Sequence, residues 1–99
     1  MGIKFEWGES KNRANAHKHG IRFDEAETVF LDENALLTDD PDHSDEEERF
    51  LLLGISSALK FLVVCHCYRE TSNGTTIIRL INARKATKTE RTQYTSRNR

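Results

Sequence analysis

Hydrophobic and polar residues alternate over several short segments of this chain, and other segments are almost continuously apolar. Alternation with a period of two predicts a half-buried β-strand, and a short apolar run predicts a strand that is buried on both faces. These patterns predict three strands, at residues 4–7, 35–38 and 50–55, the first of them at the edge of a sheet. Two further strands flank the dipeptide Asn73-Gly74 and begin at Phe61 and Thr75.

Asn73-Gly74 predicts a β-hairpin, because both residues tolerate the positive φ that a two-residue primed turn requires. This turn sets the register, in which Tyr68 faces Arg79, His66 faces Ile81 and Glu70 faces Ile77. One face is apolar and is expected to lie on the core, with Phe61, Val63, Cys65, Cys67, Ile78 and Leu80. The other face brings a base, a phenol, a carboxylate and a guanidinium together, namely His66, Tyr68, Glu70 and Arg79. Such a set on rigid strands suits phosphate chemistry.

Three helices are predicted from residues that cap helix ends. Ser10 can begin a first helix, which runs to about His19 and ends at Gly20. Capping-box spacing, an acceptor followed three residues later by glutamate, occurs twice. It predicts a second helix from Asp24 with a core face at Ala26, Val29 and Phe30, and a last helix from Thr87 to about Tyr94, followed by a frayed tail at residues 95–99.

The length of 99 residues predicts a single domain over residues 1–99. The longest apolar stretch, residues 61–67, is too short to span a bilayer, and the N-terminal residues contain no apolar run of signal-peptide length. We therefore expect a cytoplasmic protein without a membrane segment. Cys65 and Cys67 are expected to be buried, unbridged thiols, because a lone C-x-C is a weak zinc motif.

Charge is distributed very unevenly, although the formal net charge is only −1. Residues 32–50 contain nine acidic side chains and one basic one, whereas residues 51–99 contain nine basic and two acidic side chains. The basic part also contains the predicted hairpin and last helix. Arg84 and Lys85 precede the N-terminus of that helix, where free N–H groups and the helix dipole favour an anion. The sequence therefore predicts a polyanion as partner.

Several motifs together give the chain a family resemblance. They are F-E-W at residues 5–7, K-N-R-A-N at 11–15, K-H-G-I at 18–21, F-D-E-A at 23–26, P-D-H-S-D at 41–45 and E-R-F at 48–50, then H-x-Y-R at 66–69, I-R-x-I-x-A-R-K-A-T at 78–87 and E-R-x-Q-Y at 90–94. With these motifs the chain resembles the BrnT family of bacterial toxins, small ribonucleases of type II toxin–antitoxin modules. Asn82 departs from the pattern, since the family more often has serine there.

The resemblance implies an α+β fold described as RelE-like, a twisted antiparallel sheet with two N-terminal helices on one side and a C-terminal helix. It also implies RNA cleavage that inhibits translation, and neutralisation by a BrnA-like antitoxin with a ribbon-helix-helix DNA-binding region. A homodimer, or a heterotetramer with the antitoxin, is a further expectation.

RNA can be cleaved without a metal or cofactor if its own 2′-hydroxyl attacks the adjacent phosphate, which requires a base, an acid and cations. His66 or Glu70 is a candidate base, and Tyr68 or His66 a candidate acid. Arg79 is the strongest candidate for a phosphate contact, with Glu70 as its possible ion-pair partner. The other expected RNA-binding residues are Arg69, Arg84, Lys85, Lys88 and Arg91.

Two other functions stay open at this point. A metal-dependent hydrolase would use the acidic loop, with Asp39, Asp40, Asp42, His43 and Asp45 as ligands. A nucleic-acid-binding module would use the same basic surface and would bind RNA without turnover.

Overall fold

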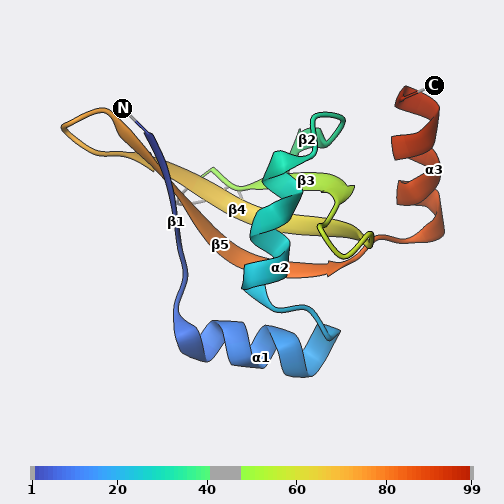
Figure 1. Ribbon diagram of the computed structural model, residues 1–99, viewed down its shortest axis with the longest axis horizontal. Helices are drawn as coiled ribbons and strands as arrows, with labels where there is room; N and C mark the ends of the chain where they lie inside the picture. Colours follow the sequence, from blue (N-terminus) through green and yellow to red (C-terminus); the bar gives the residue numbers. More distant parts are fainter. Residues whose placement is uncertain (1, 41–47, 99) are drawn as a thin grey trace.

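In the computed structural model of this chain, residues 2–40 and 48–98 are described. The chain forms a five-stranded sheet with strand order β1-β5-β4-β3-β2, and Figure 1 shows the β4–β5 hairpin and α3 at opposite ends of the molecule. The element bounds are β1 Gly2–Glu6, α1 Glu9–His19, α2 Phe23–Glu27, the 3₁₀ helix η1 Thr28–Leu31, β2 Leu36–Asp39, β3 Phe50–Ile55, β4 Phe61–Glu70, β5 Thr75–Lys85 and α3 Lys88–Arg97.

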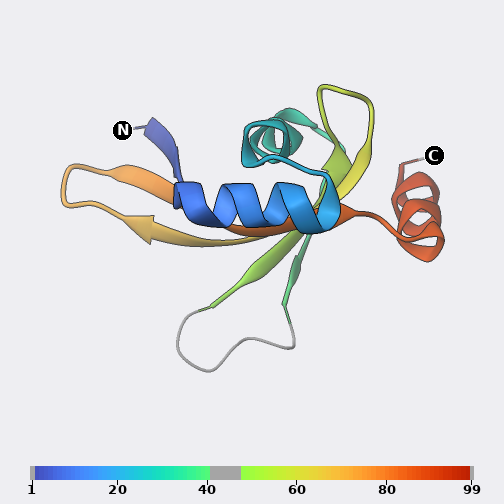
Figure 2. The same cartoon turned by 90° about the horizontal axis from the view of Figure 1, so that it is seen from below.

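The predicted α+β fold is confirmed, with all five strands close to their expected positions. Figure 2 shows α2 over one side of the sheet, as expected, while α1 lies level with the sheet, alongside β5. The pairings β2–β3, β3–β4 and β4–β5 are antiparallel, but β1 pairs parallel with β5, so the sheet is mixed. Hairpin connections force an antiparallel pairing, whereas β1 and β5 are far apart in the chain and are free of that constraint.

The two N-terminal helices begin at different residues from those predicted. α1 starts at Glu9 with Gly8 as N-cap, although its predicted C-cap, Gly20, is confirmed with a φ of 73°. α2 starts at Phe23, and Asp24 is not its N-cap. The Phe23 N–H donates instead to the side-chain oxygen Oδ1 of Asn12, 2.8 Å away in α1. A first-turn donor of α2 is thus satisfied by the preceding helix, which makes a local side-chain cap unnecessary.

α1 docks on the sheet through buried amides, since it has almost no apolar surface. Asn15 donates to the carbonyl of Ala83 at 2.9 Å and accepts from the Ala83 N–H at 3.0 Å. Its amide therefore replaces a neighbouring strand at the part of β5 that β1 does not reach. Asn15 also donates to the carbonyl of Ile21 at 2.8 Å, which connects α1, the sheet and the segment before α2.

The sheet has two unlike faces. The helix face, the face that α2 and η1 cover, carries the main core, formed by Ile21, Phe23, Ala26, Val29, Leu52, Leu62, Val64, Ile78, Leu80 and Ala83. The far face, turned away from these helices, carries a smaller cluster in which Leu53 and Val63 pack with Tyr94 of α3. In the described part of the chain, no helix is long and apolar enough to cross a membrane.

The predicted last helix is confirmed as α3, and it continues to Arg97. Thr87 is its N-cap, and the capping box with Glu90 is complete. The helix is held at its other end, where Tyr94 donates to Asp32 at 2.8 Å and Asn98 donates to the Asn34 carbonyl at 3.2 Å. Residues 95–97, which were expected to belong to a frayed tail, are therefore part of the helix.

Candidate nucleic-acid interface

The predicted hairpin register is wrong by one residue near the tip. Cys67 faces Arg79, Tyr68 faces Ile78 and His66 faces Leu80. The reason is the turn. The Gly74 N–H bonds the Thr71 carbonyl at 3.1 Å, and among the described residues of this turn only Gly74, at 85°, has a positive φ. This is a three-residue loop in which a type I turn is followed by a left-handed glycine, so one residue more than predicted lies in the turn.

A β-bulge separates this shifted part of the hairpin from its base. The register changes between Cys65 and His66, and at the base Cys65 faces Asn82 and Val63 faces Arg84, as the predicted register requires. Because each one-residue shift exchanges the faces, Ile78 and Leu80 lie on the helix face instead of the far face. Arg79 was predicted on the face opposite Cys65 and Cys67, but it lies with them on the far face.

The four predicted catalytic residues are therefore not on one face. Alternation along β4 places His66, Tyr68 and Glu70 on the helix face, while Arg79 lies on the far face. Glu70 is exposed and faces Thr76, so it is not the ion-pair partner of Arg79. The expected site is divided by the sheet into two groups.

The first group is a hydrogen-bonded pair of His66 and Tyr68. His66 is fully buried, and its Nδ1 lies 3.0 Å from the carbonyl of Val64, which can only accept. Nδ1 therefore carries the proton, and Nε2 accepts from the Tyr68 hydroxyl at 3.0 Å. Burial lowers the pKa of His66, and burial also raises the pKa of Tyr68. Both groups are thus neutral at physiological pH, and only Tyr68, which is 41% exposed, reaches the surface.

The aromatic surroundings of this pair fix its position. The ring of Phe30 packs edge-on against His66 with a centroid distance of 4.8 Å, and Phe50 lies 5.2 Å from the Tyr68 ring. The imidazole is therefore enclosed by core side chains, and His66 can act on a ligand only through the Tyr68 hydroxyl.

The second group is a carboxylate held between two arginines on the far face. Glu6 accepts from Arg69 at 3.0 and 3.3 Å and from Arg79 at 2.9 Å. Hydrogen bonds from Arg69 first, and then from Arg79, lower the pKa of Glu6. Both guanidinium groups are partly exposed, so they can contact a ligand from solvent. These two arginines are the predicted phosphate-binding residues that the structure brings together.

Glu6 was not among the predicted site residues. The alternation at residues 4–7 placed it on the Lys4 side of an edge strand, but the strand that it would meet was unknown. The parallel pairing of β1 with β5 places Glu6 directly beside Arg79. The sign of this role in the sequence is that Glu6 stands between two aromatic residues, Phe5 and Trp7, where a carboxylate needs a cation as its partner.

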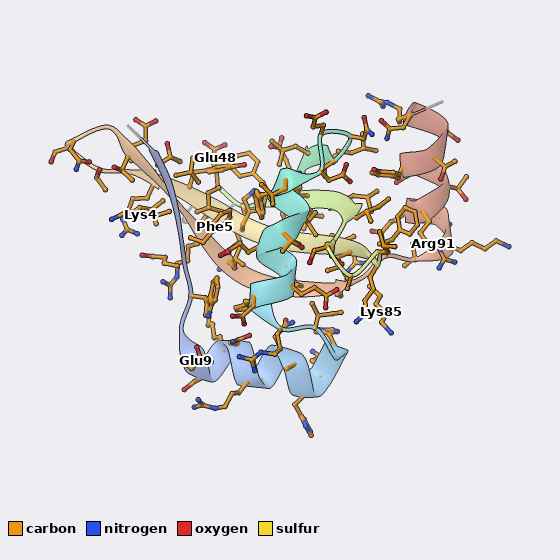
Figure 3. The ribbon with its side chains drawn as sticks, viewed as in Figure 1. Lys4, Phe5, Glu9, Glu48, Lys85 and Arg91 are labelled. Carbon is orange, nitrogen blue, oxygen red and sulfur yellow. The ribbon has the colours of Figure 1, made fainter. Side chains whose placement is uncertain are left out.

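The remaining predicted phosphate-binding residues lie at the junction of β5 and α3. Arg84 donates to both carboxylate oxygens of Glu90, at 2.8 and 2.9 Å, so its guanidinium is already engaged. Lys85, Lys88 and Arg91 are exposed around this junction. Figure 3 shows Lys85 and Arg91 at the end of the molecule opposite Lys4, which belongs to the same strand as Glu6. The junction is therefore a basic region separate from Arg69 and Arg79.

The residues proposed for a metal site are only partly described. Asp42, His43 and Asp45 lie outside the described residues. Asp39 is exposed in β2, and Asp40 is buried with one carboxylate oxygen 3.6 Å from Cys65 Sγ. Within residues 2–40 and 48–98, no three His, Cys, Asp or Glu side chains are grouped as metal ligands.

Comparisons with known proteins identify the family of this chain. A family model described as "Ribonuclease toxin, BrnT, of type II toxin-antitoxin system" matches residues 7–90. The 1.1 Å crystal structure of the Brucella abortus ribonuclease toxin BrnT is similar in fold, with a TM-score of 0.55 over 89% of this chain and 99% of that one. Its sequence is 23% identical, so this likeness concerns the fold alone. No curated protein matches the chain significantly.

Proposed function

The chain belongs to the BrnT family of ribonuclease toxins of type II toxin–antitoxin systems, and from this we propose that it cleaves RNA without a metal ion and so inhibits translation. In this proposal the 2′-hydroxyl of the RNA attacks the adjacent phosphate. The observation that supports it best is the pair of guanidinium groups on the far face, Arg69 and Arg79, which both converge on one carboxylate.

This pair is suited to an RNA phosphate for a simple geometric reason. Its N–H donors already bind two oxygen atoms of one anionic group, and a phosphodiester presents its two non-bridging oxygens in a similar way. We therefore assign the scissile phosphate to Arg69 and Arg79. Lys85, Lys88 and Arg91 would hold more distant phosphates of the same strand, and Arg84 would do so in exchange for Glu90.

The candidate acid and base predicted from the sequence lie on the helix face, away from the phosphate site on the far face. His66 is fully buried, so its role would be to position the Tyr68 hydroxyl that it accepts from. Tyr68 and Glu70 are exposed near the tip of the β4–β5 hairpin, which projects away from the helices (Figure 1). The sheet therefore separates them from a phosphate held by Arg69 and Arg79, and RNA that passes around the end of the sheet would bring Tyr68 and Glu70 to neighbouring nucleotides.

The family also implies a protein partner, because type II toxins are paired with an antitoxin. We propose that this partner is BrnA-like, with a ribbon-helix-helix region, and that one of its acidic segments covers Arg69 and Arg79. A homodimer, or a heterotetramer with the antitoxin, and a location in the cytoplasm complete the proposal.

Incubation of the purified protein with labelled RNA, with and without EDTA, tests the mechanism. Cleavage should persist in excess chelator and should leave a 2′,3′-cyclic phosphate or its hydrolysis product, since the nucleophile belongs to the RNA. An RNA with 2′-deoxyribose at the scissile position should bind and stay intact. Loss of cleavage in EDTA would favour the metal-dependent alternative, and binding without any turnover would favour the binding module.

A further inference from the structure

Glu6 occupies the place between the two arginines where the proposed function puts a phosphate. It lies opposite Arg79 in the β1–β5 pairing. Its Oε2 accepts from Arg69 at 3.0 Å and from Arg79 at 2.9 Å, and its Oε1 accepts from Arg69 at 3.3 Å. Its side chain is 32% exposed, so an incoming anion can reach it. A phosphate and this carboxylate would compete for the same N–H donors.

We infer that Glu6 is the general base of the reaction, which RNA uncovers by taking Arg69 and Arg79 away from it. This inference rests on the proposed function, because it places the scissile phosphate on these two arginines. Once displaced from its ion pairs, the carboxylate stays beside the phosphate, since β1 is hydrogen-bonded to β5. There it can accept the proton of the adjacent 2′-hydroxyl.

The chemical step needs no cofactor. The Glu6 carboxylate takes the proton as the 2′-oxygen forms a bond to phosphorus, and the bond from phosphorus to the 5′-oxygen breaks. The leaving oxygen takes a proton from water, and Glu6 later returns its proton to solvent. The products are a 2′,3′-cyclic phosphate and a 5′-hydroxyl, and Arg69 and Arg79 neutralise the charge that develops on phosphorus-bound oxygens.

The other candidate bases are placed less well for a phosphate on the far face. His66 is enclosed in the core of the helix face, and Glu70 is on that face as well. In the free protein the arginines lower the pKa of Glu6 and make it a weak base. A bound phosphate removes those hydrogen bonds and adds a negative charge, and both changes raise the pKa. Glu6 therefore gains basicity when substrate is present.

The test combines two measurements on Glu6→Gln, which has the same size and no charge. The first is the dissociation constant for a mixed-sequence RNA whose 2′-hydroxyls are all O-methylated, which cannot be cleaved. The second is the single-turnover cleavage rate of the unmodified RNA. We expect binding about fivefold tighter, because a negative charge next to the phosphate is removed. We expect cleavage slower by roughly a hundredfold to ten-thousandfold, the usual contribution of a general base.

Two further variants complete the comparison. Glu6→Asp retains the carboxylate and should recover part of the lost rate. Glu9→Gln, which removes an exposed carboxylate that pairs with Arg22 at 3.6 Å, should change neither measurement.

Two results would overturn the inference while leaving the proposed function in place. One is cleavage by Glu6→Gln at the wild-type rate. The other is weaker RNA binding by Glu6→Gln, which would mean that the carboxylate only supports the arginines. If Arg79→Ala binds the methylated RNA as tightly as the wild type, the phosphate site itself is wrong, and the inference fails with it.

Discussion

For Arg79, the sequence predicted correctly that the side chain forms an ion pair, but it predicted the wrong partner. An arginine between apolar strand residues is costly to bury unless it is paired, which made it a candidate from the sequence. It is paired, but with Glu6 of β1 and not with Glu70 of its own hairpin. The identity of the partner depends on a contact between residues 73 positions apart.

Substitution of this residue gives the clearest prediction at the scale of single side chains. Arg79→Ala should reduce RNA cleavage by about a hundredfold or more in single-turnover assays, because a charge-assisted contact to the phosphate strengthens in the transition state. Its stability should change by less than about 1 kcal/mol, since the ion pair is exposed and Glu6 keeps Arg69.

The matched control is Arg22→Ala. Arg22 is also an exposed arginine in ion pairs, with Glu9 at 3.6 Å and Asp24 at 3.4 Å, but it lies at the start of α2. Its removal should leave cleavage unchanged. Full activity in a folded Arg79→Ala protein would remove Arg79 from the site.

At the scale of elements, the junction of β5 and α3 is organised by one carboxylate. Glu90 accepts from Arg84 at 2.8 Å and from the Thr87 N–H at 2.8 Å, while the Thr87 hydroxyl accepts from the Glu90 N–H at 3.2 Å. The strand and the helix are thereby joined at a fixed angle. The Arg84 guanidinium, followed by the backbone of Thr87, lowers the pKa of Glu90 to about 2.

This lowered pKa predicts a pH-dependent contribution to stability. The ionised carboxylate stabilises the folded protein fully above the unfolded-state pKa of about 4.5, and the contribution disappears as the pH falls towards 2. Glu90→Gln should therefore cost about 1–2 kcal/mol at pH 7 and much less at pH 2.5. Urea unfolding followed by circular dichroism at both pH values measures the difference.

Glu33→Gln provides the comparison, because Glu33 is exposed in the turn before β2. Its effect on the free energy of unfolding should be small and similar at both pH values. An equal cost of Glu90→Gln at pH 7 and pH 2.5 would mean that the ion pair with Arg84 adds nothing to stability.

At the scale of the whole molecule, both faces of the sheet bury side chains, although α2 and η1 cover only one. Cys65 and Cys67 on the far face are 1% and 6% exposed, which confirms the prediction of buried thiols, and neither is bridged. Burial first, and then the charge of Asp40, raise the pKa of Cys65 to about 12. The prediction that these cysteines share a face with Ile78 and Leu80 is wrong, because Ile78 and Leu80 lie on the helix face.

The reaction rates of these two thiols should measure how often the folded sheet opens. At pH 8 the native protein should react with 5,5′-dithiobis(2-nitrobenzoic acid) at a rate set by unfolding, because burial and the raised pKa of Cys65 suppress the thiolate. Both cysteines should react within seconds in guanidinium chloride. Cys65→Ser and Cys67→Ser assign the rate of the remaining thiol, and rapid reaction of Cys65 in the native protein would contradict its burial.

The sequence by itself determined the features that depend on neighbours along the chain. Strand positions followed from apolar runs, the end of α1 from Gly20, and the start of α3 from its capping box, because these signals act over a few residues. The family motifs belong to the same category, since residues 7–90 match without reference to the fold.

Only the tertiary structure decided which functional groups meet. One extra residue in the turn shifted the hairpin register, and the bulge restored it at the base, so Arg79 and Tyr68 came to lie on opposite faces. The parallel pairing of β1 with β5 then brought Glu6 to Arg79. Turn type, bulge position and the pairing of distant strands are set by packing of the whole sheet, and a period-two pattern is the same in either register.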